Sequence, residues 1–253
     1  MSSVDVRRAP MSISTTIATA HRVLLQLRHD PRTVALLLAV PALLMVLLRY
    51  VFNSADRFSQ IAPTLLGIFP FTLMFLVTSI TTLRERTSGT LERLMTTPLA
   101  KLDLLIGYAL AFGLVALAQV VVTVAVSELL GLTLAGSLTW LLVVTAVNAL
   151  LGVALGLFCS AFARTEFQAI QFLPIVVIPQ LLLCGLFQPR DEMATVLQWA
   201  SDLMPLSYAV EALQYVARQP TVGADFARDL TVVLLCAVAA LVLAAATLRR
   251  RTA

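Results

Sequence analysis

The sequence predicts an all-α integral membrane protein with six transmembrane helices. Of its 253 residues, 59% are hydrophobic and 13% are charged, and the mean hydropathy is +0.92. Soluble globular proteins carry about 25% charged residues, so this composition excludes a soluble domain. Six apolar runs are long enough, or nearly so, to cross a hydrocarbon core about 30 Å thick. They cover residues 34–52, 61–83, 104–127, 138–162, 169–187 and 230–248 of a chain that we expect to form one transmembrane domain, 1–253.

The distribution of charge predicts the orientation of these spans. An even number of spans puts both termini on the same side of the membrane. With the termini inside, thirteen of the eighteen basic residues and six of the fourteen acidic residues lie on the cytoplasmic side. Cytoplasmic loops carry an excess of Arg and Lys, so both termini are predicted to be cytoplasmic. The basic residues follow the apolar runs and form no single exposed face, so nucleic acid is not an expected partner.

Residues 12–30 predict an amphipathic helix that lies in the membrane interface before the first span. One face carries Ile13, Ile17, Leu24 and Leu27, and the other carries Thr15, Thr19, Arg22, Gln26 and His29. Ser12 or Ser14 is placed to cap the start of this helix, and Asp30-Pro31 ends it. The alternative is an ordinary cytoplasmic tail.

A charged stretch between the second and third runs predicts a short surface helix over residues 84–97. The stretch, residues 83–105, reads LRERTSGTLERLMTTPLAKLDLL. Leu91, Leu94 and Met95 recur at helical spacing, whereas Arg86, Glu92 and Arg93 lie off that stripe. Pro98 disfavours the helical conformation of the residue before it, so the helix should end there. On composition alone, a solvated connector between two spans remains the alternative.

The segment between the fifth and sixth runs predicts two short apolar helices within residues 191–217. They are expected near 191–203 and 207–217, divided by Pro205, with Ser207 placed to cap the second. Neither is long enough to span a bilayer. We expect them to dip back into the membrane from the outer side or to lie on its surface.

The motifs of the charged stretch resemble the first cytoplasmic loop of the type-2 ATP-binding-cassette exporter permeases. They are Glu85-Arg86, the run from Gly89 to Arg93, and Thr97-Pro98-Leu99, in this order. In that family the loop forms a coupling helix that seats in a cleft of the ATPase subunit. The resemblance therefore implies an ATPase-coupling role for Glu85, Arg86, Gly89, Thr90, Leu91, Glu92, Arg93 and Pro98.

A second resemblance lies before the last span, where the family carries two re-entrant helices that close the outer end of the pathway. The matching run extends from Gly185-Leu186-Phe187 through Pro189 to Met204-Pro205-Leu206-Ser207-Tyr208 and Glu211-Ala212-Leu213. It implies a gate region that includes Gly185, Phe187, Pro189, Pro205, Leu206, Ser207, Tyr208 and Glu211. Met204 is a departure, because the family often carries Asn before this Pro-Leu pair.

These resemblances imply a permease subunit of an ATP-driven exporter in the bacterial cytoplasmic membrane. The sequence has no G-x-x-x-x-G-K-[ST] phosphate-binding loop, so ATP and Mg²⁺ are expected on a separate ATPase subunit and no cofactor on this chain. A second permease copy or a paralogue is the other expected partner, and lipid surrounds both. The apolar composition suits a hydrophobic or amphiphilic substrate, such as a drug, a lipid or a glycan, and does not decide among them.

Polar side chains inside the spans are candidates for a transport pathway, because they are costly in a bilayer. Gln119, Asn148, Gln171 and Gln180 are expected either to line such a pathway or to bond to neighbouring helices. Glu211 lies within an apolar helix and needs a partner, water or a proton. A structural role and a gating role both remain open for it.

Two other functions remain as alternatives. An ion-coupled secondary transporter would need no ATPase, although no internal repeat is visible in the sequence. An integral-membrane enzyme is the less favoured choice, because both histidines, His21 and His29, lie in the amphipathic segment at the start of the chain. No catalytic or metal site is predicted, since Cys159, Cys184 and Cys236 show no metal-binding spacing. Copurification of an ATPase discriminates among these functions.

Overall fold

The computed structural model describes residues 12–88 and 101–247, and this part of the chain contains helices and no strand. The elements are α1 (Ile13–Arg28), α2 (Pro31–Phe52), α3 (Ala55–Thr87), α5 (Lys101–Leu129), α6 (Leu138–Ser160), α7 (Glu166–Phe172), the π-helix η1 (Leu173–Val177), α8 (Ile178–Leu183), the 3-10 turn η2 (Arg190–Glu192), α9 (Thr195–Asp202), α10 (Pro205–Arg218) and α11 (Ala224–Thr247).

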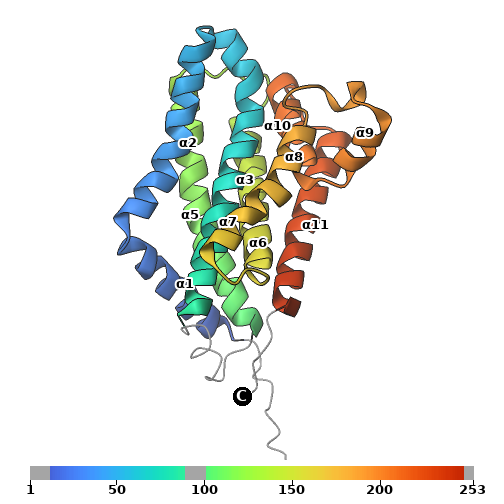
Figure 1. Cartoon of the computed structure of the whole chain (residues 1–253). Helices are drawn as coiled ribbons and strands as arrows, with labels where there is room; N and C mark the ends of the chain where they lie inside the picture. The colour runs from blue at the N-terminus through green and yellow to red at the C-terminus, as the bar shows by residue number, and fades with distance from the viewer. Residues whose placement is uncertain (1–11, 89–100, 248–253) are drawn as a thin grey trace, which may run out of the picture.

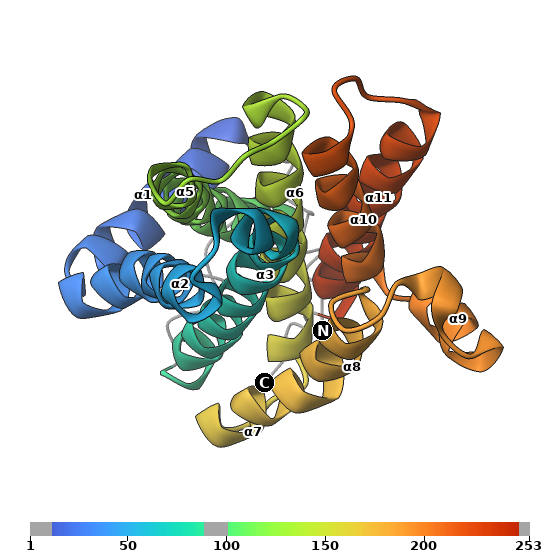
Figure 2. The same cartoon turned by 90° about the horizontal axis from the view of Figure 1, so that it is seen from above.

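Six segments of the described chain are long and apolar enough to cross a membrane. They are α2, α3, α5 from Leu102, α6, the continuous stretch Glu166–Leu183 and α11. The predicted all-α membrane fold is confirmed. Seen from above, α6 lies among α3, α5, α10 and α11, and α2 and α7 lie towards the outside (Figure 2).

The packing of α6 against α3 depends on two glycines. A Cβ atom added at Gly152 would lie 2.4 Å from the carbonyl oxygen of Phe71, and one added at Gly156 would lie 2.6 Å from that of Phe75. Real Cβ atoms do not approach backbone so closely. The small-xxx-small pair therefore allows the two helix backbones to touch, as such pairs do in membrane helices.

Helix α3 is longer at both ends than the apolar run at 61–83 suggests. It has 33 residues, which corresponds to a length of about 50 Å. Ser54 caps its start by accepting a hydrogen bond from the backbone N–H of Arg57. At the other end no Gly or Pro interrupts the chain before Gly89, and the helix continues to Thr87.

The predicted start of a separate helix at residue 84 is therefore wrong, because residues 84–87 form the last turn of α3. Glu85 and Arg86 belong to that turn. The remainder of the predicted coupling helix, with Gly89, Thr90, Leu91, Glu92, Arg93 and Pro98, lies outside the described residues.

Helix α1 lies beside the start of α5, at the lower end of the bundle in Figure 1. Its buried residues include Thr19 and Val23, and a Cβ at Gly107 of α5 would lie 2.6 Å from that of Thr19. Ile13 and Ile17 are 81% and 58% exposed. The side of α1 that contacts protein is thus mixed, since Leu27 of the predicted apolar face is buried and Gln26 and His29 of the predicted polar face are exposed. The position of α1 in the membrane interface stays a prediction.

The fifth span is interrupted by η1, which contains Pro174. Proline removes a backbone donor, and a π-turn is one way in which a helix accommodates that loss. The span ends at Leu183 and not at 187, because Gly185 takes a positive φ of 89° and turns the chain.

Two short helices, α9 and α10, follow that turn. Helix α10 begins at Pro205, two residues before the predicted start, because proline suits the first position of a helix. Ser207 is therefore inside α10 and does not cap it; its hydroxyl lies 3.3 Å from the carbonyl oxygen of Leu183. Helix α9 projects sideways from the other helices (Figure 2), and its Trp199 and Leu203 are 67% and 81% exposed.

Candidate functional site

Charged side chains gather where the segment of residues 89–100 leaves α3 and re-enters α5. We call this the α1 end of the bundle; it consists of α1, the last turn of α3 and the first turns of α5. Glu85 is 7% exposed and Asp103 is 1% exposed. Buried carboxylates need partners, and both have them.

Glu85 joins three helices. Arg22 of α1 donates to both carboxylate oxygens of Glu85, at 3.0 and 3.3 Å, in the two-armed geometry that an arginine offers to a carboxylate. The hydroxyl of Tyr108, on α5, also donates to Glu85. Arg22 in turn donates to the Tyr108 oxygen at 3.0 Å. The last turn of α3 is thereby fastened to α1 and to α5.

Asp103 holds the beginning of α1. Its carboxylate accepts hydrogen bonds from the backbone N–H of Ser12 at 3.1 Å, from the Thr15 hydroxyl at 2.9 Å and from the Thr16 hydroxyl at 3.4 Å. The start of a helix presents free N–H groups and a partial positive charge, which favour a carboxylate there. The first turn of α5 is thereby joined to α1.

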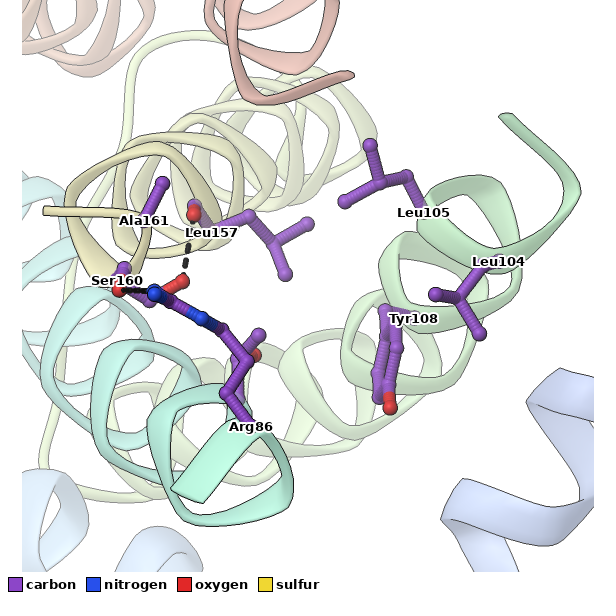
Figure 3. A pocket seen from close by; sticks show the side chains of 8 residues that line it. Arg86, Leu104, Leu105, Tyr108, Leu157, Ser160 and Ala161 are labelled. Carbon is purple, nitrogen blue, oxygen red and sulfur yellow. Dashed lines mark hydrogen bonds between the residues drawn. The ribbon is translucent and has the colours of Figure 1, made fainter. Parts of the chain in front are cut away.

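Two arginines of α3 reach the helices on its other side. The guanidinium of Arg86 donates to the carbonyl of Ser160 at the end of α6 (Figure 3). Arg84 pairs with Glu166 of α7 through contacts of 2.8 and 2.9 Å, and both side chains are at least half exposed. The last turn of α3 therefore contacts α1, α5, α6 and α7.

A small hollow lies between these contacts. Figure 3 shows Arg86 on one side, Leu157 and Ser160 on another, and Leu104 and Tyr108 facing them from α5. Its volume is about 10 Å³, which is room for one water. Among the described residues, this hollow between α3, α5 and α6 is too small for a substrate.

The predicted gate residues lie at the opposite end, which we call the α9 end and which consists of residues 184–218. Gly185 forms the turn after the fifth span, and Phe187 is 69% exposed. Pro189 precedes η2, Pro205 begins α10, and Leu206, the next residue of α10, is fully buried. The structure therefore places these predicted gate residues in one region, and their gating role stays a prediction.

Glu211 has a partner in this region. Its carboxylate lies 2.7 Å from a guanidinium nitrogen of Arg190, and its side chain is 33% exposed. Burial raises the pKa of Glu211 above its ordinary value, and the charge and hydrogen bond of Arg190 oppose that rise. A structural and a gating role are both compatible with this pair.

The four polar residues proposed for a pathway lie on four different helices. Asn148 of α6 donates to the carbonyl of Gly67 of α3 at 2.7 Å, which is an interhelical bond. Gln180 of α8 is buried and accepts from the backbone N–H of Leu206 at 3.3 Å. Gln171 is exposed on α7. Gln119 of α5 is fully buried, and neither end of its amide has a hydrogen-bond partner within the described chain.

Sequence reasoning missed several residues of these two regions. No motif of the sequence points to Tyr108, Asp103 or Arg190. A carboxylate and a tyrosine beside the start of an apolar run are a weak signal. Glu85 is 63 residues from Arg22 and 23 from Tyr108, and no local pattern pairs residues so far apart.

Comparison with known proteins agrees with this architecture. Residues 15–217 match the family model described as ABC-2 type transporter. The chain is 29% identical over 170 residues to the probable multidrug ABC transporter permease YbhS of Escherichia coli K12, covering 66% of this chain and 45% of that protein. It is 25% identical over 146 residues to the inner membrane transport permease YhhJ of the same strain, covering 57% and 39%.

A eukaryotic relative shows the same likeness. ABC transporter G family member 20 of Dictyostelium discoideum is 24% identical over 155 residues, which is 61% of this chain and 21% of that protein. The matched part of each of these relatives is less than half of its length. The family model nevertheless covers most of this chain, including most of α1, the last turn of α3, the start of α5, and residues 184–217 of the α9 end. The chain therefore belongs to the ABC-2 type transporter family.

Proposed function

We propose that this chain is the membrane-spanning permease subunit of an ATP-driven exporter. A separate ABC ATPase subunit would bind ATP and Mg²⁺ and supply the energy. The chain itself would bind no cofactor and catalyse no reaction. The family match supports this function, and so does the order of the Glu-Arg, Gly-Thr-Leu-Glu-Arg and Thr-Pro-Leu motifs in residues 85–99.

The observation that carries the proposal is the set of bonds around the last turn of α3. An ATPase that contacts residues 89–100 would move the end of α3 and the start of α5. Glu85 and Asp103 connect those two places to α1, and Arg86 connects α3 to α6. Because these bonds are short and partly buried, a displacement of the segment would be passed to several spans together.

The pathway would form between this chain and a second permease, either another copy or a paralogue. We infer that both termini and the α1 end face the cytoplasm of a bacterium, and that the α9 end faces outwards, from the distribution of basic residues. YbhS is named as a probable multidrug permease. A hydrophobic or amphiphilic compound is accordingly the substrate class that we propose, with drugs, lipids and glycans as the members to test.

The test is to purify the chain from its own cells under mild conditions and to identify what accompanies it. An ABC ATPase should copurify, and the reconstituted complex should hydrolyse ATP faster when a transported compound is added. A panel of drugs, lipids and glycolipids would identify that compound. Transport by the purified chain without any ATPase, driven by an ion gradient, would overturn the proposal in favour of a secondary transporter.

The coupling role of residues 89–97 needs a separate test. Reversing the charge of Glu92 or Arg93 would place like charges across the proposed contact with the ATPase, which weakens association by several kcal/mol. Gly89→Pro would destabilise any helix there by roughly 3 kcal/mol or more. We expect these variants to insert normally and to lose stimulation of ATP hydrolysis. Normal transport by all of them would show that the segment is only a connector.

A further inference from the structure

Arg190 makes more contacts than any other charged residue described at the α9 end. One guanidinium nitrogen donates to Asp202, the last residue of α9, and another lies 2.7 Å from Glu211 of α10. The guanidinium also lies over the ring of Tyr208, 5.1 Å from its centre, and the Tyr208 hydroxyl donates to the Asp202 carbonyl at 2.9 Å. A single side chain thus joins η2, α9 and α10.

The elements that Arg190 joins differ in how firmly they are held. Helix α10 is anchored in the bundle: Leu206, Val210 and Leu213 are fully buried, and a Cβ at Gly67 of α3 would lie 3.0 Å from Leu213. The fifth span is peripheral and contains the π-turn η1, and only 17% of its residues are buried. A helix with few buried contacts and an interrupted hydrogen-bond ladder is the element that moves most easily.

The Arg190 contacts therefore cross the boundary between the fifth span and the fixed part of the bundle. Arg190 lies seven residues after the end of that span, and its side chain packs 4.0 Å from the Cβ position of Gly185, at the turn that ends it. A second set of hydrogen bonds, between uncharged groups, connects the end of the fifth span to α9 and α10. The Ser201 hydroxyl donates to the Leu183 carbonyl at 2.8 Å, and the backbone N–H of Leu206 donates to the Gln180 side chain at 3.3 Å.

Arg190 is itself nearly buried, with 12% of its side chain exposed. A buried charge that loses one partner destabilises its surroundings far more than an exposed one does. Its Nε atom is buried and has no hydrogen-bond partner among the described residues. The guanidinium therefore keeps a free donor, which suits a side chain that exchanges acceptors when the elements around it move.

We propose that Arg190 is the positioning residue that holds the α9 end closed, by fastening the turn after the fifth span to α10 through Glu211 and to α9 through Asp202. Opening of that end separates Arg190 from Glu211, because α10 stays with the bundle and the fifth span does not. This proposal rests on the proposed export function, for which the α9 end is the exit.

Cys184 provides a reporter at this place. It follows the fifth span directly, is fully buried, and donates to the Leu181 carbonyl at 3.2 Å. Burial raises the pKa of its thiol to about 11, so the closed end should leave it almost unreactive at neutral pH. In a background with Cys159→Ala and Cys236→Ala it is the only thiol of the chain. Its reaction with a membrane-impermeant maleimide, added outside sealed proteoliposomes, then reports opening of the α9 end.

We expect Arg190→Ala to raise the rate of Cys184 modification at least tenfold, the change that about 1.4 kcal/mol produces in an opening equilibrium. Arg190→Lys keeps the charge without the two-armed geometry and should lie between Arg190→Ala and the parent. Glu211→Ala should also raise the rate. The double variant should react no faster than Arg190→Ala, because the two residues act through the same contact. Arg218→Ala, which removes an exposed charge of α10, is the matched control and should react like the parent.

General unfolding is distinguished by a second reporter. A chain with Cys184→Ala and Cys236→Ala retains only Cys159, which is buried near the opposite end of α6. If Arg190→Ala exposes Cys159 to a permeant maleimide as strongly as Cys184, the residue supports the whole fold and the proposal fails. Unchanged protection of Cys184 in a folded Arg190→Ala protein would also overturn it. Should that variant not fold, Glu211→Ala and Arg190→Lys carry the same comparison.

The resting-state comparison needs no ATPase, so its outcome is separate from that of the export function. If Cys184 becomes exposed in Arg190→Ala but no ATPase accompanies the chain, the proposed role of Arg190 in closing the α9 end is supported and the proposed export function is wrong. If the complex exports its compound normally and Cys184 stays protected in all Arg190 variants, the function stands and the closure is wrong. With both correct, ATP added to the intact complex should raise the rate of Cys184 modification in the parent chain.

Discussion

Arg22 of α1 and Glu85 of α3 form a two-armed ion pair of 3.0 and 3.3 Å, although 63 residues separate them in the sequence. The Glu85 side chain is 9% exposed and that of Arg22 is 28% exposed, so water screens this pair only in part. Tyr108 completes the set from α5. The pair therefore places α1, which precedes all the spans, in direct contact with the point from which residues 89–100 depart.

Glu85→Gln should reveal the strength of this connection. The substitution keeps the shape and leaves Arg22 without its anion, so we expect a loss of about 1.5–3 kcal/mol in the free energy of unfolding, the range for hydrogen bonds to charged groups. Stimulation of the ATPase should also fall. Thermal unfolding of the purified protein measures the first effect and hydrolysis by the complex the second.

Arg84→Ala is the control for Glu85→Gln, because it removes an ion pair from the same turn of α3. Arg84 and Glu166 are 62% and 50% exposed, and exposed pairs contribute about 0–1 kcal/mol. A loss of stability at Arg84 that equals the loss at Glu85 would contradict the importance given to the buried network.

The seam between α3 and α6 predicts a sharp difference between two glycines. Gly152→Ala would place a methyl group 2.4 Å from the Phe71 carbonyl oxygen, and a backbone atom cannot relieve the clash by changing rotamer. Gly113→Ala would meet only the end of the Leu150 side chain, at 2.8 Å, which can change rotamer. Overpacking of the first kind costs about 1–3 kcal/mol or more. Gly152→Ala should therefore have a lower melting temperature than Gly113→Ala. Equal melting temperatures would mean that α3 and α6 separate easily.

The sequence was sufficient for the spans because length and hydrophobicity decide which segments cross a bilayer. It was less informative at their ends. Helix α3 extends beyond its apolar run to Ala55 and Thr87, since a helix stops at caps and breakers and not where apolar residues stop. The end of the fifth span was predicted four residues too late, because a run of apolar residues does not reveal the positive φ of Gly185.

The candidate sites were predictable only in part. A resemblance to known motifs led to the prediction of a gate region that contains Glu211. Its partner Arg190 lies in a different element and shares no periodicity with it. Ser207 was expected to cap α10, but the preference of Pro205 for a first helical position moved the start of that helix. Pairings across the bundle depend on how helices pack, which one sequence does not reveal.

The orientation of the chain can be tested with tags. A tag inserted at Thr221, in the exposed loop before α11, should be reachable only from outside the cell, and a reporter fused after Arg251 should be active only in the cytoplasm. The physical reason is the excess of basic residues on the side of the termini. Detection of both on the same side would contradict a sixth span between them.

The pH dependence of Arg190→Ala should reveal the state of Glu211. Burial raises the pKa of Glu211 above 4.5, so the fold favours the protonated carboxyl. This contribution to stability is fully present below pH 4.5 and is lost as the pH rises through the raised pKa of the folded state. Loss of Arg190 removes a charge that lowers this pKa, so the pKa rises further. In this variant, acidification should therefore restore part of the protection of Cys184, because it removes the unpaired charge of Glu211 but not the lost bond to Arg190.

Several other groups influence that titration. Glu211 feels Arg228 and Asp229 from α11 as well as Arg190, and Asp202 and Tyr208 also contact the Arg190 guanidinium. The rate of Cys184 modification should therefore be expressed at each pH relative to Arg218→Ala, which cancels the pH dependence of the maleimide reaction itself. Arg190→Ala combined with Glu211→Gln should show no acid rescue. If acidification restores Cys184 protection in that double variant, a titrating group other than Glu211 causes the pH dependence.

Gln119 offers a final test, because its buried amide has no partner among the described residues. An unsatisfied buried polar group costs about 1–3 kcal/mol, and an apolar side chain of similar size removes that cost. Gln119→Leu should therefore leave the melting temperature unchanged or raise it. If the amide serves a pathway in another conformation, transport should fall in the same variant, whereas Asn148→Leu, which breaks the bond to Gly67, should lower stability. A Gln119→Leu protein that is less stable than the parent would show that the amide already has a partner, such as a buried water or the second permease.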